Sequence, residues 1–300
     1  MKLFFALFSF LSLSAQTTQG IAQRNEVKGF VIDENNQPIP YVNIWVENEN
    51  IGTTSDDKGF FTINTSEDKI LVFSSVGFEV KKTTIQNDGK VILKEAIYKL
   101  DEVLISKRKQ EKEIEIGDAQ RIHHRQLSGD KPWIYGKLFE QDTIYKKTPF
   151  IKKIVFYSDS DKKGAKLKIR IFEFNDSIPG NDLIEEDLIV TVNKGMKRNV
   201  IDVSKYNLLF PEKGIVIGLE WMIIQENRAD FEYKDPKTKK LVKQEDYAPS
   251  LVVNYSDKEN AFTYSKGKWH RSKVFLTEKK SKEPWYNKIM MPAINLILTN

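Results

Sequence analysis

The 300-residue sequence has no cysteine and only three histidines. Without cysteine it has no disulfide, no thiol nucleophile and no site for a lipid-modified cysteine. His123 and His124 are adjacent, so on a helix their side chains would diverge and would rarely share a metal. A Gly-x-Ser-x-Gly elbow and a glycine-rich phosphate loop are also missing. These absences argue against a conventional enzyme, and we expect no catalytic residues and no cofactor.

Long apolar runs are missing beyond the N-terminus, so no helical transmembrane segment is expected. Residues 1–15 contain Lys2, an apolar stretch and small residues that end at Ala15. This pattern predicts a cleaved signal peptide, and residues 16–25 read as a flexible leader. The alternative, a membrane anchor, would need an apolar run of roughly 20 residues. We expect an exported protein of a Gram-negative bacterium, either periplasmic, outer-membrane-associated or extracellular.

A strong charge of one sign is also missing. The 47 basic and 42 acidic residues are interleaved along the chain, which leaves a net charge of +5. Such a mixed surface is typical of a solvated protein and does not predict a nucleic-acid partner.

Residues 26–105 consist of short apolar-alternating runs separated by turn signals. A turn is expected at residues 56–59, where Gly59 supplies a positive φ angle. About seven strands without helical periodicity predict a seven-stranded β-sandwich.

Four motifs in this segment resemble one family, the carboxypeptidase regulatory-like (transthyretin-like) domain. The motifs are VKGFVID at residues 27–33, GTTSDDKGFF at 52–61, LVFSSVGF at 71–78 and LDEVLI at 100–105. The resemblance implies a transthyretin-like sandwich without catalytic residues. The same module forms the N-terminal extension of TonB-dependent receptors, where a plug and a large barrel follow. The residues after 105 are too few for such a barrel, so we expect neither plug nor barrel.

Residues 106–132 are rich in charge and read as a linker, with a short helix around residues 118–127. Residues 133–300 return to a β-pattern and predict a second sandwich, similar to the jelly-roll accessory domains of secreted bacterial proteins. Residues 166–174 alternate, and we expect Lys166, Lys168 and Arg170 to face water. Residues 215–224 are apolar on both faces and predict a central strand. The chain as a whole is therefore expected to be all-β.

Exposed aromatic rings can stack on sugars, and three tryptophans near predicted strand ends are candidates: Trp133, Trp269 and Trp285. Packing at the rim of the core is the alternative for each of them. Trp45 and Trp221 lie within strands and are expected in the core. Asp159 and Asp161 are weak candidates for a calcium loop, with a plain hairpin turn as the alternative. No other metal site is expected.

We therefore expect a non-catalytic envelope protein that binds or docks a glycan, a peptide or a protein partner. One alternative is a structural or assembly partner of an outer-membrane protein, which it would contact through sheet edges. It would then associate peripherally with the outer membrane. Another is a hydrolase acting on envelope polymers. An aromatic groove would favour the binding protein. An open apolar surface would favour the assembly partner, and two facing carboxylates would favour the hydrolase.

Overall fold

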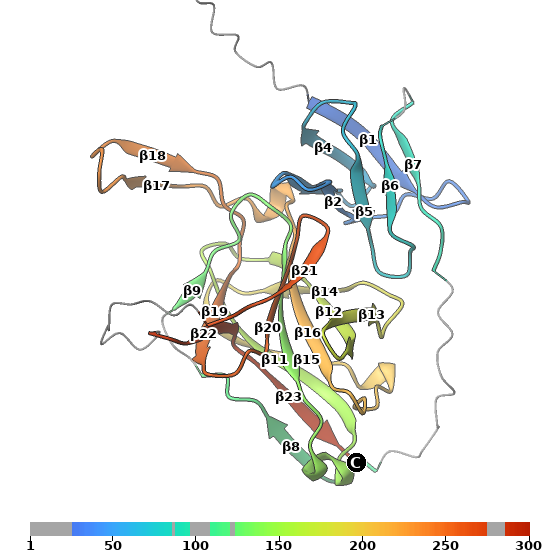
Figure 1. Ribbon diagram of the computed structural model, residues 1–300, viewed down its shortest axis with the longest axis vertical. Helices are drawn as coiled ribbons and strands as arrows, with labels where there is room; N and C mark the ends of the chain where they lie inside the picture. Colours follow the sequence, from blue (N-terminus) through green and yellow to red (C-terminus); the bar gives the residue numbers. More distant parts are fainter. Residues whose placement is uncertain (1–25, 86–87, 97–108, 121–123, 275–285) are drawn as a thin grey trace, which may run out of the picture.

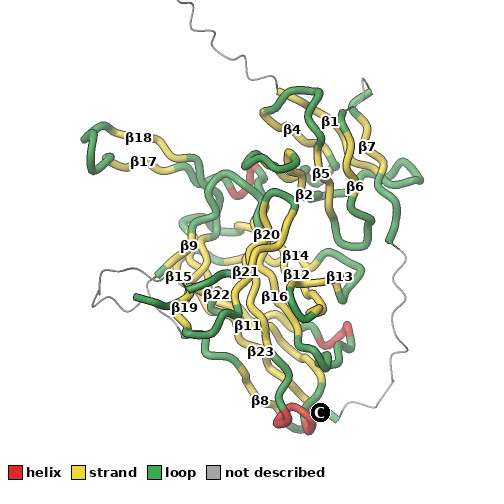
Figure 2. Tube along the Cα trace, viewed as in Figure 1, coloured by secondary structure: helices red, strands yellow, loops and turns green. Residues whose placement is uncertain are grey.

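The computed structural model describes residues 26–85, 88–96, 109–120, 124–274 and 286–300. The predicted signal peptide, the leader, the closing strand at residues 100–105 and Trp285 lie outside this part of the chain. Figures 1 and 2 show an all-β molecule of two sandwiches, and its helices are short 3-10 turns at η1 (Thr143–Lys147), η2 (Ser204–Tyr206) and η3 (Gln225–Asn227). Among the described residues, no helix has the length and apolar character needed to cross a membrane. The all-β prediction is confirmed.

The first domain is the expected seven-stranded sandwich. One sheet has the order β4 (Phe60–Asn64), β1 (Glu26–Ile32), β7 (Lys90–Ile92), and the other has the order β3 (Gly52–Thr54), β2 (Asn43–Val46), β5 (Leu71–Ser74), β6 (Lys81–Thr83). Apolar side chains from both sheets fill the core, among them Val31, Ile44 and Phe73, each fully buried. The predicted turn is present: the Asp56 carboxylate accepts hydrogen bonds from two backbone N–H groups, and Gly59 has a φ of 72°.

The second domain is a sandwich of two seven-stranded sheets, which confirms the second predicted β-sandwich. The first sheet has the order β13 (Ile178–Asp182), β12 (Ala165–Asn175), β16 (Ile215–Trp221), β10 (Ile134–Phe139), β20 (Ala261–Ser265), β21 (Lys268–Arg271), and β14 (Leu188–Val192) also pairs with β12. The second has the order β22 (Ile289–Pro292), β19 (Ser250–Ser256), β11 (Phe150–Ser160), β23 (Ile294–Thr299), β8 (Glu113–Ile116); β15 (Gly195–Asp202) pairs with β11, and β9 (Arg125–Gln126) pairs with β19.

The predicted central strand is β16, whose residues are all buried between β12 and β10. The first sheet curls, so its two end strands, β13 and β21, contact each other. This curl encloses a small apolar cluster on the face of the sheet that points away from the main core. Its buried members include Phe172, Phe174 and Phe262.

Residues 106–132 were expected to form a linker with a short helix, and the structure corrects this where it describes them. Strand β8 pairs with the terminal strand β23, and β9 pairs with β19. Ile116 is buried in the core, and the Asn295 side chain accepts a hydrogen bond from the Ala119 N–H at 2.8 Å. The high charge of the segment concealed the alternation of Ile114 and Ile116, which lets β8 extend the sheet at the edge of β23.

Candidate functional site

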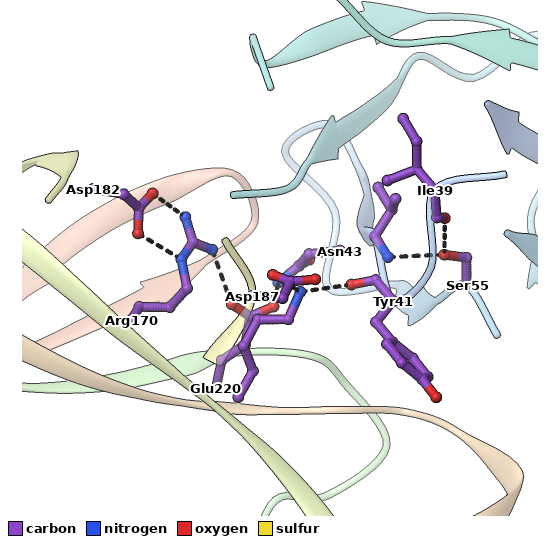
Figure 3. Close-up of polar contacts among 10 residues, drawn as sticks. Ile39, Tyr41, Asn43, Ser55, Arg170, Asp182, Asp187 and Glu220 are labelled. Carbon is purple, nitrogen blue, oxygen red and sulfur yellow. Dashed lines mark hydrogen bonds and ion pairs between the residues drawn. The ribbon is translucent and has the colours of Figure 1, made fainter. Parts of the chain in front are cut away.

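Polar and charged side chains gather where the first domain lies against β12 and β16 of the second, a surface we call the domain interface (Figure 3). Lys168 and Arg170 were expected to face water, yet only 1% and 6% of their surface is exposed. Lys168 Nζ lies 2.8 Å from Asp187 Oδ1 and donates to the backbone oxygen of Tyr41 at 3.0 Å. The prediction of a wet face was wrong because Tyr41 of the first domain contacts Lys168, and Asp182 of the neighbouring strand β13 pairs with Arg170.

Arg170 is held from two sides by carboxylates. Its Nε donates to Asp182 Oδ1 at 2.7 Å, a second N–H donates to Asp182 Oδ2, and Nη1 donates to Glu220 Oε2 at 2.9 Å. Burial alone would lower the pKa of Arg170, but the two carboxylates outweigh it and raise the pKa. From the first domain, Asn43 Nδ2 donates to Glu220 Oε1 at 3.1 Å and to the Pro132 oxygen at 3.0 Å.

Close backbone approach completes the domain interface. Gly77 has a φ of 79°, and a Cβ at this position would lie 2.7 Å from the Glu185 carbonyl oxygen. The Thr54 hydroxyl accepts from the Ile223 N–H at 3.0 Å. The charged side chains of the domain interface are paired, and the backbones of the two domains lie very close together. The interface therefore fits a structural contact between domains better than a ligand-binding site.

A groove of about 520 Å³ opens instead at the base of a two-stranded hairpin formed by β17 (Phe231–Lys234) and β18 (Leu241–Gln244). Three aromatic side chains line it: Trp133, Phe231 and Tyr233. We call this the aromatic groove. Phe231 and Tyr233 are 37% and 41% exposed, and their ring centroids lie 6.2 Å apart. Amide and carboxylate groups from Gln126, Gln244 and Asp246 also line the groove.

Trp133 is fixed in place from behind. Its ring stacks on the buried Trp221, with centroids 4.3 Å apart and planes 29° apart. Its indole N–H donates to the Ser128 backbone oxygen at 2.7 Å. The half-buried ring therefore presents its remaining surface to the groove in one orientation.

Asp246 fixes the loop that borders the groove. Its Oδ1 accepts from the Gly129 N–H at 2.7 Å and from the Ser128 hydroxyl at 3.1 Å. Burial raises the pKa of Asp246, and these hydrogen bonds oppose the rise without cancelling it. Asp246 also borders a second groove of about 360 Å³, which contains Asp159, Asp161 and Asp230.

Two further carboxylates of this second groove have structural partners. Asp159 accepts from Arg125 Nη1 at 2.9 Å, and Asp230 lies 3.0 Å from Arg228 Nη2. Asp161 is exposed in the turn between β11 and β12. Within the described ranges, no group of three His, Cys, Asp or Glu side chains is placed to hold a metal.

Of the two predicted tryptophans that the structure describes, Trp133 lines the aromatic groove and Trp269 does not. Trp269 packs edge-on against Phe172 and Tyr264, with ring centroids 5.1 and 5.3 Å away, beside the small apolar cluster. Trp45 and Trp221 are 1% and 0% exposed, as expected for core residues. Sequence reasoning missed Phe231 and Tyr233, although their period-2 spacing before a turn was a signal for a hairpin strand.

Residues 27–105 match the CarboxypepD_reg-like domain family. The TonB-dependent receptor SusC of Bacteroides thetaiotaomicron is 32% identical over 96 residues, which is 32% of this chain and 9% of the receptor. A TonB-dependent receptor of Formosa agariphila is 29% identical over 128 residues, which is 41% of this chain and 12% of the receptor. The chain thus spans about a tenth of the length of these curated relatives.

Two solved structures cover most of the chain with weak similarity. The clostridial cysteine protease Cwp84 after propeptide cleavage matches with a TM-score of 0.40 and 13% identity, over 83% of this chain and 51% of its own. Infectious bursal disease virus, Gx strain, matches with a TM-score of 0.24 and 8% identity, over 86% and 56%. Neither value supports a functional comparison. The family match therefore identifies the first domain, at residues 27–105, as a CarboxypepD_reg-like domain.

Proposed function

We propose that this protein is a non-catalytic binding module of the Gram-negative cell envelope, and that its aromatic groove holds a glycan. The observation that carries the proposal is the presence of three aromatic rings from two separate segments on one open groove. Phe231 and Tyr233 belong to a hairpin outside both sandwich cores, so packing alone does not require aromatic rings there. Apolar ring faces beside amide and carboxylate groups suit a sugar, which has an apolar face and a rim of hydroxyls.

An envelope location is supported by the similarity of part of the chain to two TonB-dependent receptors. The first domain then serves as a rigid spacer or docking module for the groove. The hydrogen bonds across the domain interface, from Asn43 to Glu220 and from Lys168 to the Tyr41 oxygen, support this role because they favour one orientation of the two domains.

A non-catalytic role is supported by the partners of three of the four aspartates that line the second groove. Asp159, Asp230 and Asp246 are held by Arg125, Arg228 and the loop at residues 128–129. A glycosidase needs one carboxyl group free to donate a proton and another free to act as base or nucleophile.

The test is a screen of envelope glycans with the purified chain, followed by calorimetric titration of any ligand found. We expect Phe231→Ala and Tyr233→Ala each to weaken binding on the order of tenfold, which corresponds to one lost ring contact of about 1.4 kcal/mol. Phe30→Ala is the matched control, because Phe30 is 46% exposed on the first domain. Trp269→Ala should also leave the affinity unchanged.

Three results would refute the proposal. If no glycan binds, or if the groove variants bind as well as the wild type, the groove is not a glycan site. Release of shortened sugars from an envelope polymer would show that the protein is a hydrolase instead.

A second candidate, assembly with an outer-membrane protein, is favoured by one surface of the first domain. On the outer face of the β4-β1-β7 sheet, Phe30 lies opposite Phe60 with ring centroids 5.1 Å apart, and Ile92 is 44% exposed. If this face docks a protein, Phe30→Glu should abolish co-purification with envelope proteins and leave glycan binding intact.

A further inference from the structure

The hairpin of β17 and β18, residues 231–244, stands apart from both sandwiches, and we call it the hairpin arm. Its two strands pair only with each other, and Figures 1 and 2 show it projecting away from the body. The turn at its tip is nonetheless well defined. The Asp235 carboxylate accepts from the N–H groups of Lys237 and Thr238 at 2.9 and 2.6 Å, and the Asp235 N–H donates to the Lys240 oxygen at 2.9 Å.

The hairpin arm has a large share of the positive charge of the chain. It contains five lysines against Glu232 and Asp235, a net charge of +3, while the whole chain has +5. The five are Lys234, Lys237, Lys239, Lys240 and Lys243. The ion pairs of the described residues include none of these five. Residues 234–240 at the tip contain four lysines and one acidic residue, Asp235, so net positive charge accumulates there.

An exposed apolar side chain lies among these lysines. Leu241 is 68% exposed, the largest exposure among the large hydrophobic side chains of the described residues. Its cross-strand partner is Lys234, so the two side chains lie next to each other on one face of the ribbon. A soluble polyanion would pair with the lysines and leave Leu241 in water. The boundary of a lipid bilayer takes up a leucine while its anionic headgroups contact lysines.

We propose that the tip of the hairpin arm docks the protein on an anionic lipid surface. The lysines lie in the headgroup layer, and Leu241 enters the boundary of the acyl chains. The aromatic groove lies at the base of the same hairpin, so docking would hold a bound glycan close to the membrane. The lipid site and the glycan site use different residues, so either can fail without the other.

The experiment is co-sedimentation of the purified full chain with vesicles of phosphatidylcholine alone and of phosphatidylcholine with phosphatidylglycerol. We expect binding only to the anionic vesicles, and weaker binding as salt is raised above about 0.15 M. The variant Lys234→Gln, Lys237→Gln, Lys240→Gln should lower the partition coefficient roughly 100-fold, at roughly fivefold for each lysine. Leu241→Ser should lower it further at constant charge.

The matched control is Lys146→Gln, Lys147→Gln, Lys194→Gln, which removes the same charge from exposed lysines elsewhere. It should bind anionic vesicles nearly as well as the wild type. The proposal is overturned if this control loses as much binding as the tip variant, or if neutral vesicles bind equally well. It is also overturned if dextran sulfate binds the chain while vesicles do not, because the partner would then be a soluble polyanion. Retained glycan binding by the tip variant would show that its groove is still folded.

Discussion

Basic side chains are frequent both on β12 and in the hairpin arm, but their surroundings differ. Lys168 and Arg170 on β12 are buried, and they are paired with Asp187, Asp182 and Glu220. The lysines of the hairpin arm are exposed, and the interactions described for them include no ion pair. Basic residues therefore have different roles in the two regions. The buried, paired side chains belong to the structural network beside the domain interface, where Lys168 also donates to Tyr41 of the first domain. An exposed and unpaired lysine remains available to a partner.

The largest expected effect comes from breaking the buried network. Arg170→Ala leaves Asp182 and Glu220 buried without their cation, and we expect it to lower the free energy of unfolding by about 3–5 kcal/mol. Arg198→Ala is the control, because Arg198 pairs with Glu115 at 3.3 Å on the surface and should contribute about 0–1 kcal/mol. Urea unfolding measures both. Equal losses would show that the domain interface does not bury Arg170 in solution.

A smaller loss is expected when only the first domain's side of the interface is changed. Asn43→Ala removes the hydrogen bonds to Glu220 and to the Pro132 oxygen, and leaves a buried carboxylate oxygen less satisfied. We expect a loss of about 1–3 kcal/mol in the same assay. Asn64→Ala is the control, since Asn64 is exposed at the end of β4. If Asn43→Ala has no effect, the two domains do not dock through this surface.

Features that depend on neighbouring residues could be predicted from the sequence, whereas contacts between distant segments could not. The period-2 pattern of residues 166–174 correctly separated Leu167, Ile169 and Ile171, which enter the core, from the basic face. The pattern could not show what covers that face, because the partner is a domain more than a hundred residues earlier in the chain. For the same reason the sequence could identify Trp133 as a candidate but could not show that it lies beside Phe231 and Tyr233. That proximity depends on where the hairpin folds back. Turn residues and the alternation of apolar side chains are signals within a short stretch of sequence. The docking of distant segments leaves no such local signal.

A third prediction compares the two acids of the hairpin region. Burial raises the pKa of Asp246 at the base, whereas backbone hydrogen bonds lower the pKa of Asp235 at the exposed tip. With a raised pKa, folded Asp246 binds its proton more tightly than the unfolded chain does. Its contribution to stability is therefore greatest below about pH 4 and is lost as the pH rises through the folded-state value.

Asp246→Asn keeps an oxygen for the Gly129 N–H and removes this titration. The difference in unfolding free energy between variant and wild type should change in favour of the variant as pH rises from about 4 to 7. The size should be on the order of 1 kcal/mol or less. Chemical denaturation at several pH values measures it. A difference that is constant with pH would show that Asp246 is as solvated in the folded protein as in the unfolded chain.

The smallest effect on stability is expected at the tip of the hairpin arm. Lys240 is exposed and its side chain lies away from both cores, so Lys240→Gln should change the free energy of unfolding by less than about 0.5 kcal/mol. Sedimentation with anionic vesicles should nevertheless fall roughly fivefold, because one headgroup contact is lost. Arg170→Ala should show the reverse, a large loss of stability with vesicle binding retained below the unfolding transition. If Lys240→Gln destabilised the fold as Asn43→Ala does, the ammonium group of Lys240 would have a structural partner. The distinction between the buried domain interface and an exposed docking surface at the tip would then be wrong.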